Sequence, residues 1–440
     1  MLGARPESPG SCAVATATAT AVVGTGTATV ATVDRRAAVP LLRRLRSAEG
    51  LACPFPIYDE LRAMGDLVPA PWGGYLVTGY DACNQVLRGR HWLVPDFAWQ
   101  DRQTETERWH AVATQEMSRT LSRLNAPEHT RQRHSLGNLF DRHTLQDMAP
   151  HIEADVTALL DRLAERIRVD GEADLSSLVS ERLPINTVGR WLDIAPEDYA
   201  HILDMTHNQV HAQELLPSKS QLAISEEATL HLRRYFTDLV QGRRENPGDD
   251  VVSGWIRTWD ALESDREATD RIVYQLTMFV TIASLETTAT MLSTLVWSLL
   301  RSPGSWEGLR ARPEHIDGAI EEALRYDPPI RLNSRVAGED TEVAGVFVPK
   351  DTMVHVMYGA ANHDPRRNPD PQVFDILRKG SHIAFGGGAH YCLGAGLAKL
   401  EARILLGQLL RRFPTLRAAG PPEYAPRMVF HRVTSLRVAA

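Results

Sequence analysis

The chain has 440 residues but only four cysteines and no excess of basic charge. The cysteines, Cys12, Cys53, Cys83 and Cys392, form no Cys-x-x-Cys pair, so the sequence indicates neither a structural zinc site nor the dense disulfide framework of a small secreted domain. The formal net charge of -7 gives no sign of a nucleic-acid-binding footprint or of a polybasic membrane anchor. We therefore expect a cytoplasmic protein that binds neither nucleic acid nor membrane.

Long apolar runs are also scarce, and the one long enough to cross a membrane carries a charge at its centre. Residues 272–300 are mostly apolar, but Glu286 lies in their middle with Thr287 and Thr288 beside it. An unpaired carboxylate at the bilayer centre costs roughly 3 kcal/mol on insertion scales. A helix that is apolar on all sides is equally typical of the buried centre of a large soluble fold. The sequence favours this buried helix.

A stretch near the N-terminus, residues 13–33, lacks the large apolar side chains that build a core. Residues 13–33 consist only of Ala, Thr, Val and Gly, a composition that predicts disorder. A secretory signal is the alternative, but Arg5 is followed within four residues by two prolines and a glutamate, and threonines dilute the apolar stretch. A misassigned translational start would produce a similar segment. The sequence thus predicts a disordered segment over 1–45 and one large domain over 46–440.

The remaining sequence is mainly helical, with a few short strands. Hydrophobic residues make up 43% of the chain, which is enough for a large core. Helical periodicity predicts helices over 57–64, 80–89, 128–140, 145–168, 188–216, 222–242 and 269–302. Strand-like runs lie at 73–80, near 346, at 353–358 and at 428–438. This pattern predicts a mainly α fold with small β-sheets (α+β).

Cys392 lies in a glycine-rich loop that leads into an amphipathic helix. Gly386 to Gly388 allow a tight turn, and Gly394 permits close approach just after the cysteine. The apolar side of the following helix is formed by Leu393, Leu397, Leu400, Ile404 and Leu405. At a helix N-terminus, free N–H groups and the helix dipole favour thiolate over thiol. Such a thiolate is a good iron ligand, although a lone cysteine in a glycine-rich turn is more often structural.

The loop resembles the cysteine-loop signature of the cytochrome P-450 family at five positions within ten residues: Phe385, Gly388, His390, Cys392 and Gly394. The resemblance implies haem b as the cofactor, with Cys392 as the axial ligand of its iron and His390 in contact with a haem propionate. It extends over roughly residues 50–440. It therefore also implies the fold of that family, a single large domain with a long central helix over the haem.

Further segments match the family in the same order along the chain. Glu322 and Arg325 are three residues apart and share a helical face, as in an ordinary surface pair. The resemblance makes them an internal pair that supports the haem-binding core. His129 and Arg133 are four apart, and Arg335 begins a strand-like segment. The resemblance assigns these three residues to the haem propionates.

The central apolar helix contains the segment that resembles the oxygen-binding region of the family. Carried over by position, Glu286 and Thr287 become the catalytic acid–alcohol pair. A hydroxyl can position water and bound oxygen, while a carboxylate relays protons from solvent. An acidic residue in an apolar helix is expected to titrate abnormally, which suits a relay. The alternative is a buried glutamate that neighbouring threonines satisfy.

The sequence departs from the family pattern at three places. Ser284 replaces the usual glycine of the oxygen-binding segment and leaves the details of oxygen activation open. Val373 stands where an arginine often completes a triad with the Glu-x-x-Arg pair, and His363 or Arg378 could take that role. Residues 125–126, Asn-Ala, replace a common Asp-Pro. None of these changes removes an iron ligand.

By resemblance, the protein is a haem-dependent monooxygenase that inserts oxygen from O2 into a small organic molecule of the secondary-metabolite type. The segment after Cys392 is too short for a reductase domain, so we expect electrons from a separate ferredoxin and its NAD(P)H-dependent reductase. A basic face for that ferredoxin is predicted at Lys399, Arg403, Arg411 and Arg412, although a simply solvated helix face fits equally well. A haem-thiolate sensor without turnover is the rival function. Ring coupling, desaturation and peroxide-driven chemistry are further possibilities.

Three segments are expected to line the substrate pocket: 90–118, 205–216 and the residues just after Pro329. The first is rich in tryptophan, which offers apolar surface for a bulky substrate. The third contains Arg331 and Asn333. We therefore expect a substrate with at least one polar or anionic group, anchored by Arg331.

Overall fold

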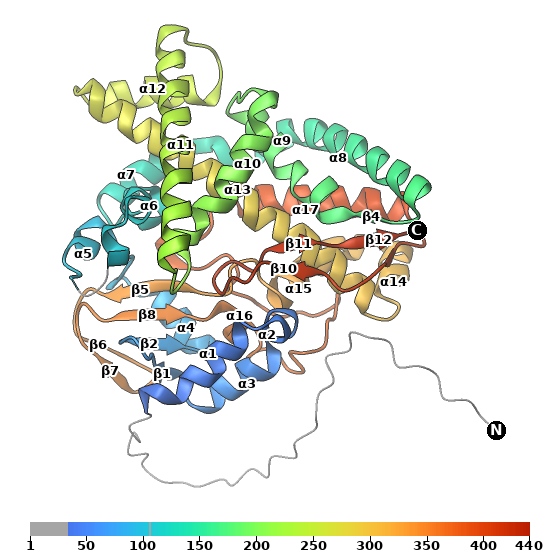
Figure 1. Cartoon of the computed structure of the whole chain (residues 1–440), viewed down its shortest axis with the longest axis horizontal. Helices are drawn as coiled ribbons and strands as arrows, with labels where there is room; N and C mark the ends of the chain where they lie inside the picture. The colour runs from blue at the N-terminus through green and yellow to red at the C-terminus, as the bar shows by residue number, and fades with distance from the viewer. Residues whose placement is uncertain (1–33, 105–106) are drawn as a thin grey trace.

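Helices dominate the protein, as the periodicity of its sequence predicted (Figure 1). The computed structural model describes residues 34–104 and 107–440. The helices are α1 Val39–Leu45, α2 Ala48–Ala52, α3 Phe55–Ala63, α4 Tyr80–Arg88, α5 Phe97–Asp101, α6 Val112–Met117, α7 Glu128–Ser135, α8 Arg142–Asp170, α9 Arg182–Trp191, α10 Tyr199–Gln209, α11 Lys219–Glu245, α12 Val251–Leu262, α13 Arg266–Arg301, α14 Ser305–Ala311, α15 Ile316–Tyr326, α16 Tyr358–Asn362 and α17 Ala395–Arg412. Short 3-10 turns connect several of them.

The strands form one sheet of five and three smaller sheets. The large sheet has the order β1-β2-β8-β5-β3, and β2 and β8 are its parallel pair. Its strands are β1 Leu67–Pro69, β2 Tyr75–Val77, β8 Met353–Val356, β5 Asn333–Ala337 and β3 Trp92–Leu93. The smaller sheets pair β4 Ala173–Asp174 and β9 Arg417–Ala418 with β12 Arg437–Ala439, β10 Glu423–Tyr424 with β11 Val433–Ser435, and β6 Thr341–Val343 with β7 Val346–Val348. The predicted strands at 353–358 and near 346 are therefore present.

The predicted helices differ from the structure over 188–216 and at α12. The single helix expected over 188–216 is two helices, α9 and α10, because Asp193 adopts a positive φ of 53° and Pro196 starts a new turn. The helix α12 was not predicted. The side chain of Asp250 caps its first turn by accepting a hydrogen bond from the Ser253 N–H, and Trp259 is fully buried against neighbouring helices.

The folded domain begins earlier than the predicted boundary at residue 45. Residues Arg35–Ala38 form a 3-10 turn, and α1 follows directly. Leu41, Leu42 and Leu45 are buried there and pack in one cluster with side chains of α3. Leucines spaced one, three and four residues apart form a narrow apolar face, which is why this part of the segment folds. The rest of the predicted disordered segment, residues 1–33, lies outside the described residues.

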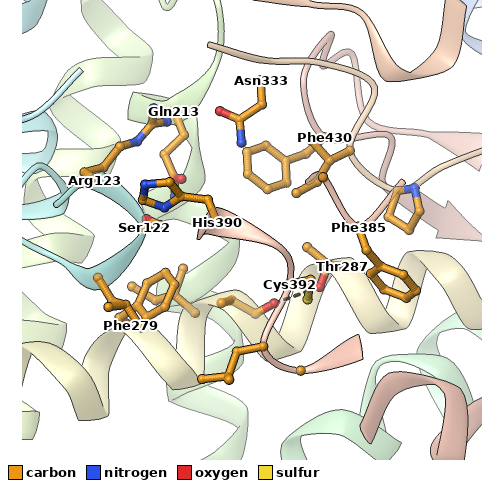
Figure 2. Close-up of a pocket in the computed structure, with 18 of the residues that line it drawn as sticks. Ser122, Arg123, Gln213, Phe279, Thr287, Asn333, Phe385, His390, Cys392 and Phe430 are labelled. Atoms are coloured by element: carbon orange, nitrogen blue, oxygen red, sulfur yellow. Dashed lines mark hydrogen bonds between the residues drawn. The ribbon is translucent and has the colours of Figure 1, made fainter. Parts of the chain in front are cut away.

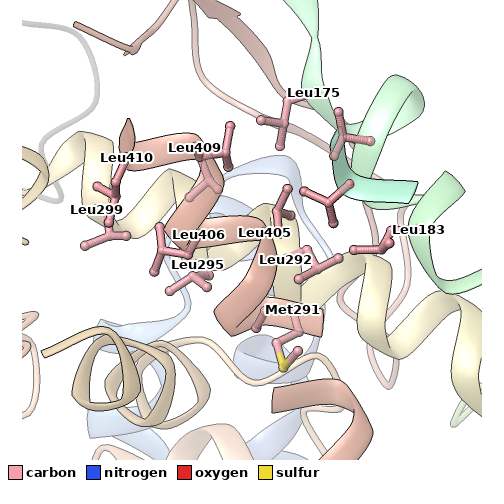
Figure 3. Close-up of a cluster of buried hydrophobic side chains, with 14 of the residues drawn as sticks. Leu175, Leu183, Met291, Leu292, Leu295, Leu299, Leu405, Leu406, Leu409 and Leu410 are labelled. Atoms are coloured by element: carbon pink, nitrogen blue, oxygen red, sulfur yellow. The ribbon is translucent and has the colours of Figure 1, made fainter. Parts of the chain in front are cut away.

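The long helix α13 runs through the centre of the molecule (Figure 1). It is long and apolar enough to cross a membrane, but most of its apolar stretch is buried inside the protein. Its leucines pack against those of α17, as Figure 3 shows for Leu292, Leu295 and Leu299 beside Leu405, Leu406 and Leu410. The prediction of a buried core helix is thus confirmed, because most of this stretch lies inside the protein.

Candidate active site

Cys392 opens into a cavity of about 330 Å³ between α13, α7, β5 and the loop that carries the cysteine (Figure 2). The loop is folded back on itself, since the N–H of Cys392 donates to the carbonyl of Phe385 at 2.9 Å. Gly388 has a φ of +63°, and a Cβ there would lie 2.4 Å from the carbonyl oxygen of Leu87. Glycine is therefore required at 388 for both its backbone conformation and its close contact.

The thiol of Cys392 precedes α17, as the sequence predicted. Burial raises the pKa of this thiol, while the N–H groups of Gly394 and Ala395 and the charge of Arg133 act in the opposite direction. The helix-terminal donors are present, but burial outweighs them in the free thiol. A bound metal ion deprotonates a coordinating thiol outright, and the same N–H groups then stabilise the thiolate.

Four predicted propionate ligands, His129, Arg133, Arg335 and His390, line this cavity together. The rings of His129 and His390 lie 4.1 Å apart. Burial and the neighbouring charges, Arg335 first among them, lower the pKa of His390 to about 2. Burial and the charges of Arg133 and Arg335 likewise lower the pKa of His129. The site is therefore a strongly positive pocket that would attract anionic groups.

Two further arginines of the cavity were missed by sequence reasoning. Arg123 precedes α7, and Figure 2 shows it near His390. Burial and the charge of Arg335 lower its pKa to about 10. Arg108 lies in the segment 90–118, for which only the tryptophans were predicted to line the cavity. Two features of the sequence could have identified them. Arg108 lies within a segment predicted to line the pocket, and Arg123 lies just ahead of the helix that carries His129 and Arg133.

The central helix turns Thr287 and Ser284 toward the cavity. Each hydroxyl donates to the backbone carbonyl four residues earlier, Thr287 to Ala283 and Ser284 to Val280, both at 2.7 Å. The serine that replaces the family glycine thus has its hydroxyl hydrogen engaged with the helix itself. Its oxygen, like that of Thr287, can still accept a hydrogen bond from a group in the cavity.

Glu286 is fully buried and lies outside the cavity lining. Its two oxygens bind Arg427 at 2.6 Å and the Nδ1 of His207 at 3.0 Å. Burial acts to raise the pKa of Glu286, but these two cationic partners outweigh it and hold the pKa below its ordinary value. The alternative of a satisfied buried glutamate therefore holds in part: Glu286 is buried and fully paired, but its partners are His207 and Arg427 and not the neighbouring threonines.

A chain of ionisable groups continues from Glu286 toward the surface. The Nε2 of His207 lies 3.5 Å from Glu181, whose carboxylate pairs with Arg432 at 2.7 Å. Burial acts to lower the pKa of His207, but Glu181 and Glu286 on either side hold it above its ordinary value. Glu181 and Arg432 are partly exposed. Protons therefore have a line of titratable groups between solvent and Glu286.

The Glu322–Arg325 pair is internal, as the resemblance implied. Arg325 donates to both oxygens of Glu322, at 2.7 and 2.8 Å, and each side chain is only 2% exposed. Arg378 completes the triad with its Nε 3.2 Å from Glu322. His363, the other candidate, stacks on Phe55 and contacts the carbonyl of Tyr326 instead. Arg378 therefore takes the place of the arginine that the family often has at position 373.

The prediction that Arg331 anchors the substrate is wrong. Its guanidinium lies in the core and donates to the carbonyl of Leu51, to Asp327 and to His431. It does not line the cavity, because the Asp327 four residues before it pulls the side chain inward. The three predicted segments themselves do line the cavity, through residues such as Trp109, Leu215 and Asn333.

Glu401 of α17 is a buried acid that, unlike Glu286, does line the cavity. Burial raises its pKa to about 7, and its Oε1 has no hydrogen-bond partner within the described part of the chain. The sequence carried a signal that was overlooked. Glu401 is four residues from both Leu397 and Leu405, so it interrupts the apolar face of the predicted helix.

The other described cysteines take no part in this cavity. Cys83 is a buried free thiol of α4 whose sulfur contacts the carbonyl of Val77. Cys53 is disulfide-bonded, which the sequence analysis did not predict. Among the described cysteines, therefore, only Cys392 offers a thiol to the cavity.

Comparison with known proteins identifies relatives of one family. The family model described as "Cytochrome P450" matches residues 309–427. The cytochrome P450 monooxygenase PikC of Streptomyces venezuelae is 32% identical over 83% of this chain and 85% of its own length. The biotin biosynthesis cytochrome P450 of Bacillus subtilis is 29% identical over 89% of this chain and 97% of its own. Both relatives are bacterial cytochromes P450, and the name of the second places it in biotin biosynthesis.

A solved structure supports the same fold. Ligand-free CYP164A2 of Mycobacterium smegmatis superposes with a TM-score of 0.81 at 31% identity and covers 91% of this chain and 100% of its own. The residues present fit a haem. A free thiol, two histidines and three arginines without carboxylate partners surround one end of the cavity, where an iron and two propionates require a soft ligand and cationic donors.

Proposed function

Because the chain belongs to the cytochrome P450 family, whose members are haem-thiolate monooxygenases, we propose that it inserts an oxygen atom from O2 into a small organic substrate held above a haem that Cys392 binds. The observation that carries this proposal is that one cavity brings together the Cys392 thiol and the Thr287 hydroxyl. When bound, a haem supplies the iron at which O2 is activated. His129, Arg133, Arg335 and His390 would hold its propionates.

The protein's own residues handle the protons that this reaction consumes. The Thr287 hydroxyl faces the cavity and can hold a water molecule there by hydrogen bonds. Glu286, next in sequence but turned away from the cavity, exchanges protons with His207 and Glu181. In this proposal the chain Glu181–His207–Glu286 conducts protons from solvent, and water carries them on to Thr287.

The substrate is proposed to be a small metabolite of a biosynthetic pathway, and the electrons to come from a separate ferredoxin with its NAD(P)H-dependent reductase. The biosynthetic roles in the names of two similar proteins, a biotin biosynthesis cytochrome P450 and a P450 of chuangxinmycin biosynthesis, support the first point. The rival function, a haem-thiolate sensor, has no use for a proton path. Coupled consumption of O2 and formation of product therefore separates the two.

The first test concerns the ligand. The reduced, CO-bound holoprotein should show the red-shifted absorption band of a thiolate-bound haem. Cys392→Ala should abolish this band, whereas Cys83→Ala, which changes a buried thiol outside the cavity, should keep it. Persistence of the band in the Cys392→Ala variant would rule out the proposed ligand.

The second test concerns proton delivery. Thr287→Val should lower the fraction of O2 consumption that yields product by about tenfold, because general acid–base groups contribute at least that much. Thr281→Val is the matched control. Thr281 lies on the same helix and makes the same hydrogen bond to the carbonyl four residues back, at 2.9 Å, but it does not line the cavity. Equal coupling in the two variants would show that protons take another route.

A further inference from the structure

Four arginines line the cavity: Arg108, Arg123, Arg133 and Arg335. Arg108, Arg133 and Arg335 donate to backbone carbonyls, those of Leu215, Tyr391 and Ser334, and none of the four arginines donates to a carboxylate of the described chain. Glu401 is the one acidic residue among the described side chains that line the cavity, and burial raises its pKa to about 7. The cavity thus carries positive charge that the protein does not neutralise.

A haem neutralises only part of this charge. Iron(III), the porphyrin dianion and the cysteine thiolate balance one another, so the haem contributes two negative charges, those of its propionates. Two propionates cannot offset four arginines. Uncompensated charge in a buried site costs several kcal/mol, which an anionic partner would relieve.

Arg108 is held at a different part of the cavity wall from Arg133 and Arg335. Its Nη1 donates to the carbonyl of Leu215, whereas Arg133 and Arg335 donate to the carbonyls of Tyr391, in the cysteine loop, and of Ser334. The charge of Arg123 acts on both Arg108 and His390, so the two parts adjoin. Leu215 belongs to the segment 205–216, which was predicted to line the substrate pocket and does line the cavity, so Arg108 lies beside that segment.

The guanidinium of Arg108 is held in place but keeps a free edge. Its Nη1 donates to the carbonyl of Leu215, and its Cζ lies 4.5 Å from the centre of the Trp109 ring. Its Nε is buried and has no hydrogen-bond partner. The Nε–Nη2 edge of an arginine matches the two oxygens of a carboxylate.

The acidic side chain whose charge acts on Arg108 is otherwise engaged. Glu214 accepts hydrogen bonds from the backbone N–H groups of Met428, Val429 and Phe430, at 2.8 to 3.2 Å. It fixes the C-terminal loop over the cavity and does not line the cavity itself. Arg108 is therefore left with a carbonyl as its hydrogen-bond acceptor.

We propose that Arg108 binds the carboxylate of the substrate, which makes the substrate an organic acid with an apolar body. The apolar lining around the anchor, Trp109, Leu215, Phe279 and Phe430, takes that body and directs it toward the haem. This assignment rests on the proposed monooxygenase function and replaces Arg331 as the anchor. It adds the class of substrate to that function.

The test uses iron-binding probes, because the natural substrate is unidentified. Alkyl imidazoles that end in a carboxylate are compared with alkyl imidazoles of the same length that end in an alcohol. The imidazole nitrogen binds the haem iron and shifts its absorption, so both series report a Kd on the ferric holoprotein whatever the shape of the pocket. The number of methylenes is increased stepwise until the chain can reach Arg108.

At one chain length the acid should bind about tenfold more tightly than the alcohol. Arg108→Gln should bring the two Kd values to within about twofold of each other and leave the Kd of the alcohol unchanged. Arg108→Lys should retain part of the preference for the acid over the alcohol, because lysine keeps the positive charge but lacks the paired N–H donors of the guanidinium. Arg102→Gln, which alters an exposed arginine paired with Asp351 in the same segment, should retain all of it.

Equal affinity of acid and alcohol at every length, or a preference that survives Arg108→Gln, would overturn the assignment. The alcohol series also shows whether each variant is folded and loaded with haem. If the wild-type holoprotein bound no imidazole and showed no thiolate band with CO, the result would instead count against the proposed function. The two failures are therefore distinguishable.

Discussion

A single buried carboxyl makes the stability of this protein depend on pH. Burial raises the pKa of Glu401 from its ordinary value of 4.5 to about 7. The unfolded chain therefore loses this proton near pH 4.5, while the folded protein keeps it until about pH 7. The stabilisation is fully present below pH 4.5, declines between these two values and is lost above pH 7. The shift corresponds to about 3 kcal/mol.

Glu401→Gln should remove this dependence, because the amide is neutral at every pH. The variant should be more stable than the wild type by up to about 3 kcal/mol at pH 8, and the difference should shrink steadily toward pH 5. Urea unfolding of the holoprotein at several pH values measures it. Glu307→Gln, at an exposed position, is the control. A constant difference between wild type and Glu401→Gln over this range would contradict the raised pKa.

At the scale of the helix, the same motif occurs in two environments. Glu322 and Arg325 of α15 form a Glu-x-x-Arg pair that is 2% exposed, and Glu165 and Arg168 of α8 form one whose side chains are 59% and 70% exposed. Both pairs have hydrogen bonds of 2.7 to 2.8 Å. Their energetic roles differ because only the internal pair is removed from water.

Glu322→Ala should lower the free energy of unfolding by about 3–5 kcal/mol, because it leaves Arg325 buried without a counter-charge. Glu165→Ala should leave the free energy of unfolding close to that of the wild type, since water solvates Arg168. Urea denaturation of the two variants gives the comparison directly. Similar losses in both would mean that burial does not decide the contribution of this motif.

At the scale of the whole molecule, the predicted basic face is largely neutralised by the protein itself. Lys399 pairs with Glu321 at 2.5 Å and Arg403 with Asp317 at 2.7 Å, and Arg412 pairs with Asp161. With a net charge of -7, the protein offers little long-range attraction to an acidic ferredoxin. Docking of the proposed ferredoxin at this face would therefore depend on cations that the carboxylates of the protein leave unpaired.

Asp317→Asn should accelerate reduction by a ferredoxin roughly twofold at low salt, because it frees Arg403. The gain should vanish at about 0.5 M salt, where such charges are screened within a few ångströms. Stopped-flow reduction under CO measures the rate. A gain that persists at high salt, or no gain at low salt, would count against electrostatic docking at this face.

The sequence by itself determined the features that are local in the chain. The cysteine loop, the helix behind it and the central helix with Thr287 each occupy one continuous stretch, so spacing and residue type were enough to predict them. The four predicted propionate ligands could be identified for a related reason, because each lies in a short segment that resembles a segment of the family. All four line the cavity.

Only the tertiary structure decided which charges meet. Glu286 is neutralised by Arg427, 141 residues further along the chain, and no local pattern encodes that contact. Arg331 turned inward to Asp327, while Arg108 was left in the cavity with a free edge. Burial and partner choice depend on how distant segments pack, and for an ionisable side chain these two quantities set both its pKa and its function.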